Sequence, residues 1–144
     1  MFFSSRYEDA VREPDETWRD WAAQAAAGAE RALFVVEDDD GWVGVVGGFR
    51  RVDPAEVQLV SLWVDPRARG RGVAQALIRA VAAWARELEA RRVVLFVQEV
   101  NAPGQALYAK AGFRPTGDRM PVGIGRRGFK RVFAASVDEL LPKA

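Results

Sequence analysis

The sequence predicts an α/β domain built on a mixed, mostly antiparallel sheet. Three apolar, β-rich segments over 31–37, 42–49 and 56–64 follow one another with short polar connections between them, as in a β-meander. An amphipathic helix is expected next, over 72–88. A nearly continuous apolar strand over 92–98 follows that helix, and such continuity is typical of strands that are covered on both faces. This order of elements indicates a sheet with parallel and antiparallel pairs, flanked by helices.

An earlier helix is expected over 14–27. Pro14 suits the first turn of a helix, and Gly28 suits its end. The apolar side chains of this segment recur at helical spacing on one face, at Trp18, Trp21, Ala22 and Ala25.

The helix over 72–88 has the clearest pattern in the chain, and a shorter helix is expected over 102–111. Asn101 can cap the shorter helix, and Gly112 can end it. The apolar stripe of the longer helix consists of Val73, Leu77, Ile78, Val81, Trp84, Ala85 and Leu88.

Extended structure is expected to resume at Phe113. We expect a flexible basic loop over 123–128, a last strand over 129–135 and a short helical tail over 137–141. No linker, repeat or low-complexity tract divides the chain, so its 144 residues are expected to form a single domain, residues 1–144.

The composition excludes several kinds of chemistry. The chain contains no cysteine and no histidine, which excludes disulfides, Ser–His and Cys–His hydrolases and histidine-based metal sites. No metal is expected. Any acyl transfer must be direct, or pass through a hydroxyl, a lysine or a carboxylate. No apolar run approaches 18 residues and the N-terminus lacks the apolar region of a signal peptide, so we expect a cytoplasmic protein without a membrane partner.

Charge is divided unevenly along the chain. Residues 1–66 carry 14 acidic and 6 basic side chains, whereas residues 67–144 carry 15 basic and 6 acidic ones. This asymmetry favours a polyanionic partner for the second half and a cationic partner for the first, although solvated acidic faces explain the first half equally well. The basic half could also bind nucleic acid, but no nucleic-acid motif occurs and none is expected as a partner.

The connection between the third strand and the longer helix is rich in arginine and glycine. Arg67, Arg69 and Arg71 supply forked donors that suit phosphate. Gly70 and Gly72 carry no Cβ, so a ligand can approach the backbone closely. The N–H groups at the start of a helix lack partners and lie at the positive end of the helix dipole. The connection therefore predicts a phosphate-binding site.

A dinucleotide fingerprint is an alternative interpretation of the same loop. Gly70-x-Gly72-x-x-Gln75 approaches the Gly-x-Gly-x-x-Gly/Ala pattern but lacks its third small residue. The next strand, over 92–98, also has no acidic residue at its end before Glu99, where that fingerprint expects one. An ordinary glycine-containing connection with solvated arginines is the other alternative.

The motif Arg69-Gly70-Arg71-Gly72-Val73-Ala74 resembles the acetyl-CoA-binding signature of the GNAT N-acetyltransferase superfamily, Gln/Arg-x-x-Gly-x-Gly/Ala. The preceding Leu-Trp-Val-Asp-Pro run, 62–66, resembles the end of the family's fourth strand. Downstream, the Asn, Leu-Tyr and Gly-Phe elements of 101–113 resemble a second family segment. The resemblance covers roughly residues 32–120, and the combination is far more specific than the loop alone.

The resemblance implies a GNAT fold, in which two central parallel strands are splayed apart and the cofactor lies in the split. Family members usually open with a strand and a helix before the segment that 14–27 resembles, and only thirteen residues precede it here. The first strand is therefore expected to be missing or shortened. An incomplete sheet edge would give two copies a reason to pair as a homodimer.

The resemblance also implies acetyl-CoA as cosubstrate and assigns residues to it. The backbone of Leu62, Trp63 and Val64 would pair with the pantetheine arm, although Leu62 and Val64 could equally serve the core. Asn101 would contact the cofactor or cap its helix. The pyrophosphate would be held by the N–H groups of Arg69, Gly70, Arg71, Gly72, Val73 and Ala74.

Tyr108 resembles the family's general acid, which would protonate the departing thiolate. The general base is less well defined, because a position that carries glutamate in some members corresponds to Gln58 here. Glu56, two residues earlier and on the same strand face, and Glu99, after the next strand, are the candidates. Each could equally be a solvated carboxylate, and ordered water could instead relay the proton to a backbone carbonyl.

Three functions follow from these observations. The first is an acetyl-CoA-dependent N-acetyltransferase that moves an acetyl group directly to a primary amine of a small molecule or peptide. The second is a non-catalytic acyl-CoA-binding or sensing domain, which Gln58 and the short N-terminus suggest. The third is a basic nucleic-acid-binding domain. The sequence does not rank polyamine, aminoglycoside, lysine or protein N-terminus as the acceptor.

Overall fold

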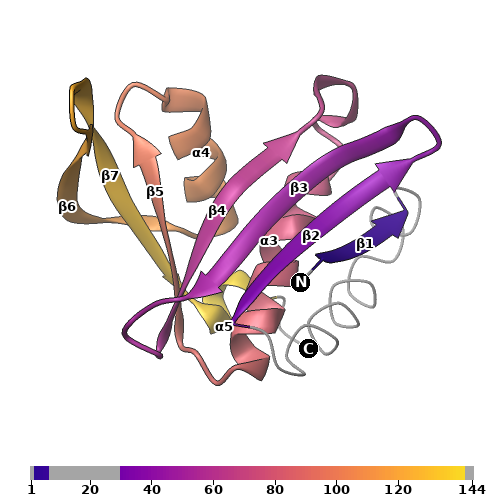
Figure 1. The fold of residues 1–144 in the computed structure, drawn as a ribbon, viewed down its shortest axis with the longest axis horizontal. Helices are drawn as coiled ribbons and strands as arrows, with labels where there is room; N and C mark the ends of the chain where they lie inside the picture. Colours follow the sequence, from indigo (N-terminus) through magenta and orange to yellow (C-terminus); the bar gives the residue numbers. More distant parts are fainter. Residues whose placement is uncertain (1, 7–29, 142–144) are drawn as a thin grey trace.

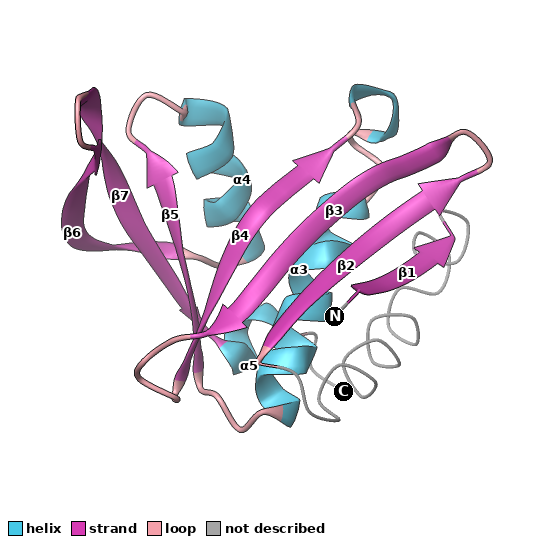
Figure 2. Ribbon diagram, viewed as in Figure 1, coloured by secondary structure: helices cyan, strands magenta, loops and turns pink. Residues whose placement is uncertain are grey.

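The structure is a computed structural model that describes residues 2–6 and 30–141 of the chain. Its strands form one sheet in the order β1-β2-β3-β4-β5-β7-β6, with helices packed against it (Figure 1; Figure 2 separates helices from strands by colour). The described helices are η1 (Pro66–Ala68), α3 (Val73–Glu87), α4 (Ala102–Ala111) and α5 (Val137–Leu140). The strands are β1 (Phe2–Arg6), β2 (Arg31–Asp38), β3 (Gly41–Arg50), β4 (Glu56–Val64), β5 (Arg92–Gln98), β6 (Arg114–Gly123) and β7 (Arg126–Ser136).

The sheet is mixed and mostly antiparallel, as the sequence predicts. Only β1 with β2 and β4 with β5 run parallel, and the other neighbouring strands are antiparallel. The expected bounds of β4, β5 and α4 agree with the structure, and α3 lies between Gly72 and Leu88 as its two caps. These elements have strong apolar periodicity or clear end signals, which is why the sequence places them well.

The first strand is present. β1 pairs in parallel with β2, from Phe2 opposite Leu33 to Arg6 opposite Glu37. β1 is described over five residues, so the expectation that the first strand is missing is wrong. The parallel edge of β2 supplies its hydrogen-bond partners. The helix expected over 14–27 lies outside the described residues, and the pairing of two copies stays a prediction.

The flexible loop expected over 123–128 is wrong. β6 and β7 continue to pair up to Gly123 opposite Arg126, and a tight turn at Ile124 and Gly125 joins them. Gly125 takes a φ of +75°, which glycine adopts without strain. The glycine- and arginine-rich composition suggested a loop, but pairing between the two strands makes the segment a hairpin. The last strand therefore begins at Arg126 and not at Phe129.

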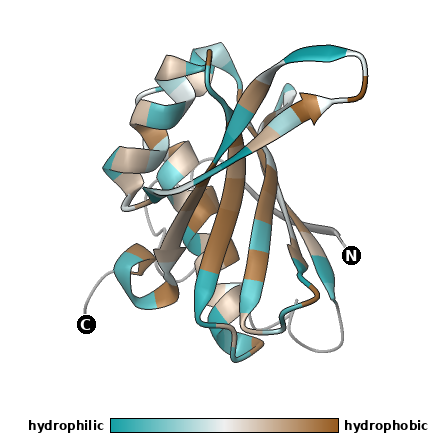
Figure 3. Ribbon diagram, turned by 90° about the vertical axis from the view of Figure 1, so that its left-hand side faces the viewer, coloured by the Kyte–Doolittle hydropathy of each residue, from teal (hydrophilic) through white to brown (hydrophobic). Residues whose placement is uncertain are grey.

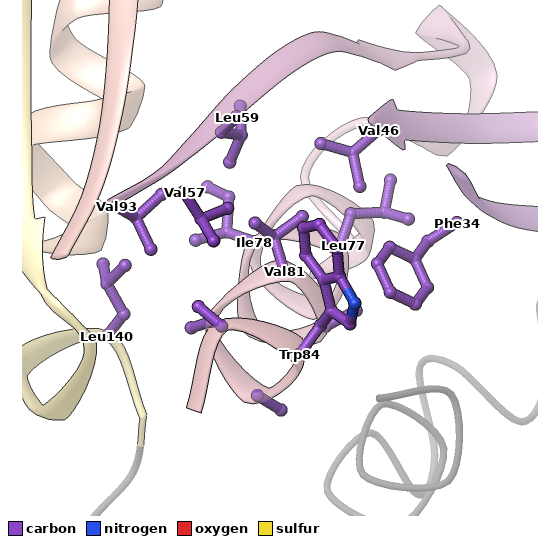
Figure 4. Close-up of a cluster of buried hydrophobic side chains, with 14 of the residues drawn as sticks. Phe34, Val46, Val57, Leu59, Leu77, Ile78, Val81, Trp84, Val93 and Leu140 are labelled. Atoms are coloured by element: carbon purple, nitrogen blue, oxygen red, sulfur yellow. The ribbon is translucent and has the colours of Figure 1, made fainter. Parts of the chain in front are cut away.

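The main core lies between the sheet and α3. Helix α3 contacts β2, β3, β4 and β5, and Trp84 is fully buried among Val81, Leu77 and Phe34 (Figure 4). In Figure 3 hydrophobic residues run along the middle of the central strands, and hydrophilic ones gather towards their ends. Burial of this face fixes α3 against β4, and therefore fixes the loop that joins them. No helix in the described part is both long and apolar enough to cross a membrane.

Gly48 gives a direct test of this packing. A Cβ at Gly48 would lie 2.8 Å from the Trp84 ring, which is fully buried and cannot turn aside into solvent. We expect Gly48→Ala to lower the free energy of unfolding by about 1–3 kcal/mol through overpacking. Gly123→Ala is the matched control, because its Cβ would meet nothing closer than 3.9 Å. Urea denaturation of both variants measures the difference, and equal stability would contradict the packing described.

Candidate active site

The parallel strands β4 and β5 pair only at one end. Their register runs from Glu56 opposite Arg92 to Gln58 opposite Val94, and then stops. Beyond this point β4 keeps β3 as its neighbour and β5 keeps β7, and the two strands diverge towards their carboxyl ends (Figure 1). The facing edges of both strands therefore carry backbone N–H and C=O groups without a strand partner.

A β-bulge lies in β4 just beyond the last β4–β5 pair. Ser61 takes a φ of +57°, and the register with β3 shifts between Val45 opposite Trp63 and Gly47 opposite Val60. One extra residue of β4 is thus accommodated, which bends the strand and re-aims the residues that follow.

The bulge explains which residues of β4 face the core. Val57 and Leu59 are buried before it, and Leu62 and Val64 pack against the same core after it. The core-facing residues of β4 therefore have odd numbers before the bulge and even numbers after it, because the bulge adds one residue. Trp63 consequently points away from the core and is 44% exposed.

The chain between β4 and α3 is braced by Asp65. Its carboxylate accepts hydrogen bonds from the backbone N–H of Arg67 at 2.9 Å and from the Arg67 guanidinium at 3.2 Å, which caps η1. Arg69 donates from its Nε to the Val64 carbonyl at 3.3 Å, and from its backbone N–H to the Pro66 carbonyl at 3.4 Å. The backbone N–H of Arg69 is therefore already used, and its side chain positions the loop.

Two glycines follow at the start of α3. Gly70 and Gly72 take φ values of +76° and +85°, and a Cβ at either would meet nothing within 4 Å. No side chain caps α3 at Gly72. The first N–H groups of the helix therefore receive no hydrogen bond from an N-cap side chain, and they lie at the positive end of the helix dipole.

Helix α4 stands beside the diverging strands, held to β5 and β7 rather than to β4. Asn101 accepts a hydrogen bond from the Gly104 N–H at 3.0 Å, so its side-chain oxygen caps the helix. Gln105 donates to the carbonyls of Gln98 and Glu99, at 3.2 and 2.9 Å. Its own oxygen accepts from Arg131 at 2.9 Å. One glutamine side chain thus joins α4 to the end of β5 and to β7.

This anchoring positions Tyr108. Its ring packs edge-on against Phe113, with ring centres 5.9 Å apart. Burial raises the pKa of the Tyr108 phenol above its ordinary value, so the group keeps its proton at neutral pH.

A pocket of about 170 Å³ opens where β4 and β5 part. Tyr108 and Gln58 both line it, so the structure brings together two residues that are 50 positions apart in the sequence. The other lining residues are Leu59, Val60, Ser61, Leu95, Phe96 and Lys130.

The two candidate bases are each paired with arginine, and neither lines this pocket. Glu56 lies 3.4 Å from Arg51 and 3.3 Å from Arg92, at the closed end of the split. The Glu99 carboxylate accepts hydrogen bonds from two guanidinium nitrogens of Arg119, Nε and Nη2. The hydrogen bond from Arg119 lowers the pKa of Glu99, which weakens it as a base. Within the described ranges, no three carboxylates converge as a metal site would require.

Comparison with known proteins identifies the family. The model of the Acetyltransferase (GNAT) family matches residues 2–113. The chain belongs to the GNAT family. The splayed strands and the glycine-containing start of α3, both expected from the resemblance, thus lie in a GNAT domain.

Relatives and solved structures agree with this assignment. Human N-acetyltransferase 8B is 36% identical over 89 residues, which are 59% of this chain and 39% of that protein. The chain thus spans about two fifths of that relative's length. The crystal structure of nourseothricin acetyltransferase shares 27% identity at a TM-score of 0.70, covering 75% of this chain and 66% of that one.

A putative streptothricin acetyltransferase from Bacillus anthracis, solved in complex with acetyl coenzyme A, shares the fold. Its TM-score is 0.68 at 18% identity, over 76% of this chain and 64% of that one. The GNAT fold expected from the resemblance is therefore confirmed.

Sequence reasoning missed three residues of this GNAT site. The strand expected over 56–64 includes Ser61 without a bulge, although the change from odd to even core-facing positions between Leu59 and Leu62 is a signal for one. Gln105 and Lys130 gave no local signal, because their roles depend on strands that are distant in the sequence.

Proposed function

We propose that this GNAT domain is an acetyl-CoA-dependent N-acetyltransferase that transfers an acetyl group directly to a primary amine of a small molecule or peptide. The parting of β4 and β5 beside the uncapped start of α3 carries this proposal. The split between β4 and β5 would provide three things in one place: an open strand edge, a site for phosphates at the start of α3, and the phenol of Tyr108. Membership of the GNAT family supports the same conclusion.

The unpaired edge of β4 suits the pantetheine arm. The backbone of Leu62, Trp63 and Val64 lies beyond the last pair with β5. Its N–H and C=O groups on that side would therefore pair with an extended ligand, apart from the Val64 carbonyl, which already accepts from Arg69. Leu62 and Val64 pack their side chains against the core at the same time. These residues would hold the arm as an added strand, by β-augmentation.

The start of α3 suits the pyrophosphate. The N–H groups of Gly70, Arg71, Gly72, Val73 and Ala74 would donate to phosphate oxygens, and the absence of a Cβ at the two glycines leaves the approach open. Arg69 would shape the loop through its bond to Val64. Asn101, whose oxygen caps α4, keeps its amide N–H₂ as a donor towards the cofactor.

Tyr108 is proposed as the general acid. Acetyl transfer breaks the carbon–sulfur bond of the thioester, and the thiolate leaving group needs a proton. A phenol with a raised pKa retains that proton throughout the neutral range. Because Tyr108 lines the split from α4, it can supply the proton from the side opposite β4.

Glu56 is proposed as the general base, through ordered water. It lies two residues before Gln58 on the same strand face, and Gln58 lines the pocket. Glu99 is the weaker candidate because its hydrogen bond with Arg119 lowers its pKa. Gln58 also motivates the alternative, an acyl-CoA-binding domain without turnover, since glutamine cannot accept a proton from the amine.

Binding of acetyl-CoA tests the first step. Gly72→Glu would place a carboxylate at the proposed phosphate site, so we expect acetyl-CoA affinity to fall at least about tenfold, equivalent to about 1.4 kcal/mol. Gly125→Glu is the matched control. Gly125 also has a left-handed backbone conformation, in the β6–β7 hairpin, so the substitution should destabilise the fold by a similar amount. Calorimetry on both variants decides the point. Equal losses of acetyl-CoA affinity in the two variants would show that the loss comes from impaired folding. A wild-type protein that does not bind acetyl-CoA would refute the proposed function.

Tyr108→Phe tests the acid. The variant keeps the ring that packs on Phe113 and removes only the hydroxyl. We expect kcat to fall by about 10²–10⁴ across pH 6–9 with acetyl-CoA affinity retained, because the phenol is protonated throughout this range. Release of CoA thiol in the presence of an amine measures the rate. Unchanged turnover across this range would remove Tyr108 from the mechanism. Acetyl-CoA binding by the wild type without any amine-dependent release of CoA would favour the binding-domain alternative.

Glu56→Gln and Glu99→Gln separate the two bases. If Glu56 relays the proton, its variant should lose about 10²–10⁴ in kcat/KM near pH 7 and recover as pH rises, since the amine is then already neutral. Glu99→Gln should leave kcat/KM almost unchanged. Both carboxylates are paired with arginine, so the denaturation midpoint of each variant serves as the folding control. A profile in which only Glu99→Gln loses activity would reverse the assignment.

A further inference from the structure

The pocket between the parted strands contains one charged side chain. Lys130 of β7 lines it, together with Tyr108 of α4 and residues of β4 and β5. No carboxylate of the described residues lines this pocket. The electrostatic character of the described wall is therefore positive, although the usual acceptor of the reaction is an amine that is cationic in solution.

The other cations near the split are already paired. Arg51 binds the oxygen of Gln58, approaches Glu56 and stacks over Phe96. Arg119 binds Glu99 and stacks over a neighbouring aromatic ring. Both guanidinium groups thus have a carboxylate partner within the protein, Glu56 for Arg51 and Glu99 for Arg119.

Arg131, next to Lys130 on β7, is also engaged. It donates to Gln105 and lies over the ring of Phe133, at 5.4 Å. It helps to hold α4 in place, so it belongs to the scaffold of the pocket.

Lys130 differs from these arginines. It stands opposite Gln98 on β5 and Met120 on β6, and neither neighbour carries a charge. No carboxylate among the described residues forms an ion pair with it. Lys130 is half-buried. A partly buried ammonium group beside the proposed reaction site, with no counter-ion among the described residues, is suited to an anionic group of the substrate.

We infer that the acceptor is an amine that carries a carboxylate close to the reacting nitrogen, as an α-amino acid does, and that Lys130 binds this carboxylate. The inference rests on the proposed acetyl transfer. The pocket volume of about 170 Å³ supports a short separation between the two groups, since pockets that bind drug-sized ligands measure about 300–1,000 Å³. A polyamine would bring only positive charge towards Lys130 and is disfavoured.

The same charge would assist the chemistry. A cation beside a bound ammonium group favours loss of its proton, because like charges disfavour the charged form. Lys130 would therefore bind the acceptor through its carboxylate and raise the share of neutral, nucleophilic amine. The amine nitrogen then forms the new bond to the acetyl carbon, and the carbon–sulfur bond of the thioester breaks. The electron pair of that bond leaves with sulfur, Tyr108 protonates the CoA thiolate, and the proton from nitrogen leaves through water towards Glu56. Lys130 acts here as a specificity-determining and positioning residue.

Matched pairs of amines test this inference. Wild type is assayed by CoA thiol release with L-phenylalanine against phenethylamine, L-leucine against isopentylamine and L-alanine against ethylamine. Each pair differs only in the carboxylate. We expect kcat/KM to favour the amino acid by at least about tenfold. Lys130→Gln should abolish most of this preference by lowering kcat/KM for the amino acids, leaving KM for acetyl-CoA unchanged, and Lys130→Arg should restore part of it.

The outcomes separate the inference from the function on which it rests. Equal or better turnover of the decarboxylated amines by wild type would overturn the inference and leave acetyl transfer intact. Equal losses for both members of a pair in Lys130→Gln, or a raised KM for acetyl-CoA, would overturn the role of Lys130. No turnover with any amine would refute acetyl transfer and the inference together. Calorimetry with N-acetyl-L-phenylalanine gives a readout without turnover, and affinity that is unchanged in Lys130→Gln would also overturn the inference.

Discussion

The site depends on the early end of pairing between β4 and β5. Three residue pairs join these strands, and beyond Gln58 and Val94 each strand keeps only its outer neighbour. A parallel sheet that continued to pair would leave no unsatisfied backbone between its central strands. Packing of α3 on one side and the pairing of β5 with β7 on the other keep the two halves of the sheet apart. The unpaired backbone, the pocket and the position of Tyr108 all follow from this separation.

The carboxylates near the split are held by arginine partners, and this pairing determines which charges face the split. Glu56 and Glu99 are bound by arginines, and Asp65 is used to brace the loop before α3. Three anionic groups are thereby directed to structural partners, while the start of α3 and Lys130 keep positive character towards the split. A site with this balance is suited to substrates that bring negative charge at two places, the phosphates of the cosubstrate and the carboxylate inferred for the acceptor.

The sequence predicts those elements whose bounds are set by a local pattern of residues. The bounds of β4, β5 and α4 follow from apolar runs and from Asn101 and Gly112 at the ends of the helix. The presence of β1, the hairpin at Gly125 and the bulge at Ser61 depend on a neighbouring strand, which periodicity does not report. The site divides in the same way. Sequence motifs point to the proposed phosphate loop and to Tyr108, whereas the positions of Gln105 and Lys130 beside the split depend on α4, β5 and β7 coming together.

The three-pair junction between β4 and β5 has a mechanical consequence. Helix α4 is joined through Gln105 to β5 and β7, whereas the loop before α3 is joined through Arg69 to β4. The phenol and the proposed phosphate loop are therefore attached to different halves of the sheet, and three residue pairs join these halves at the closed end of the split. Small changes in side-chain volume at this junction, at Val57 or Val93, would alter the width of the site several residues away. Specificity in this domain can thus be tuned by residues that never touch a substrate.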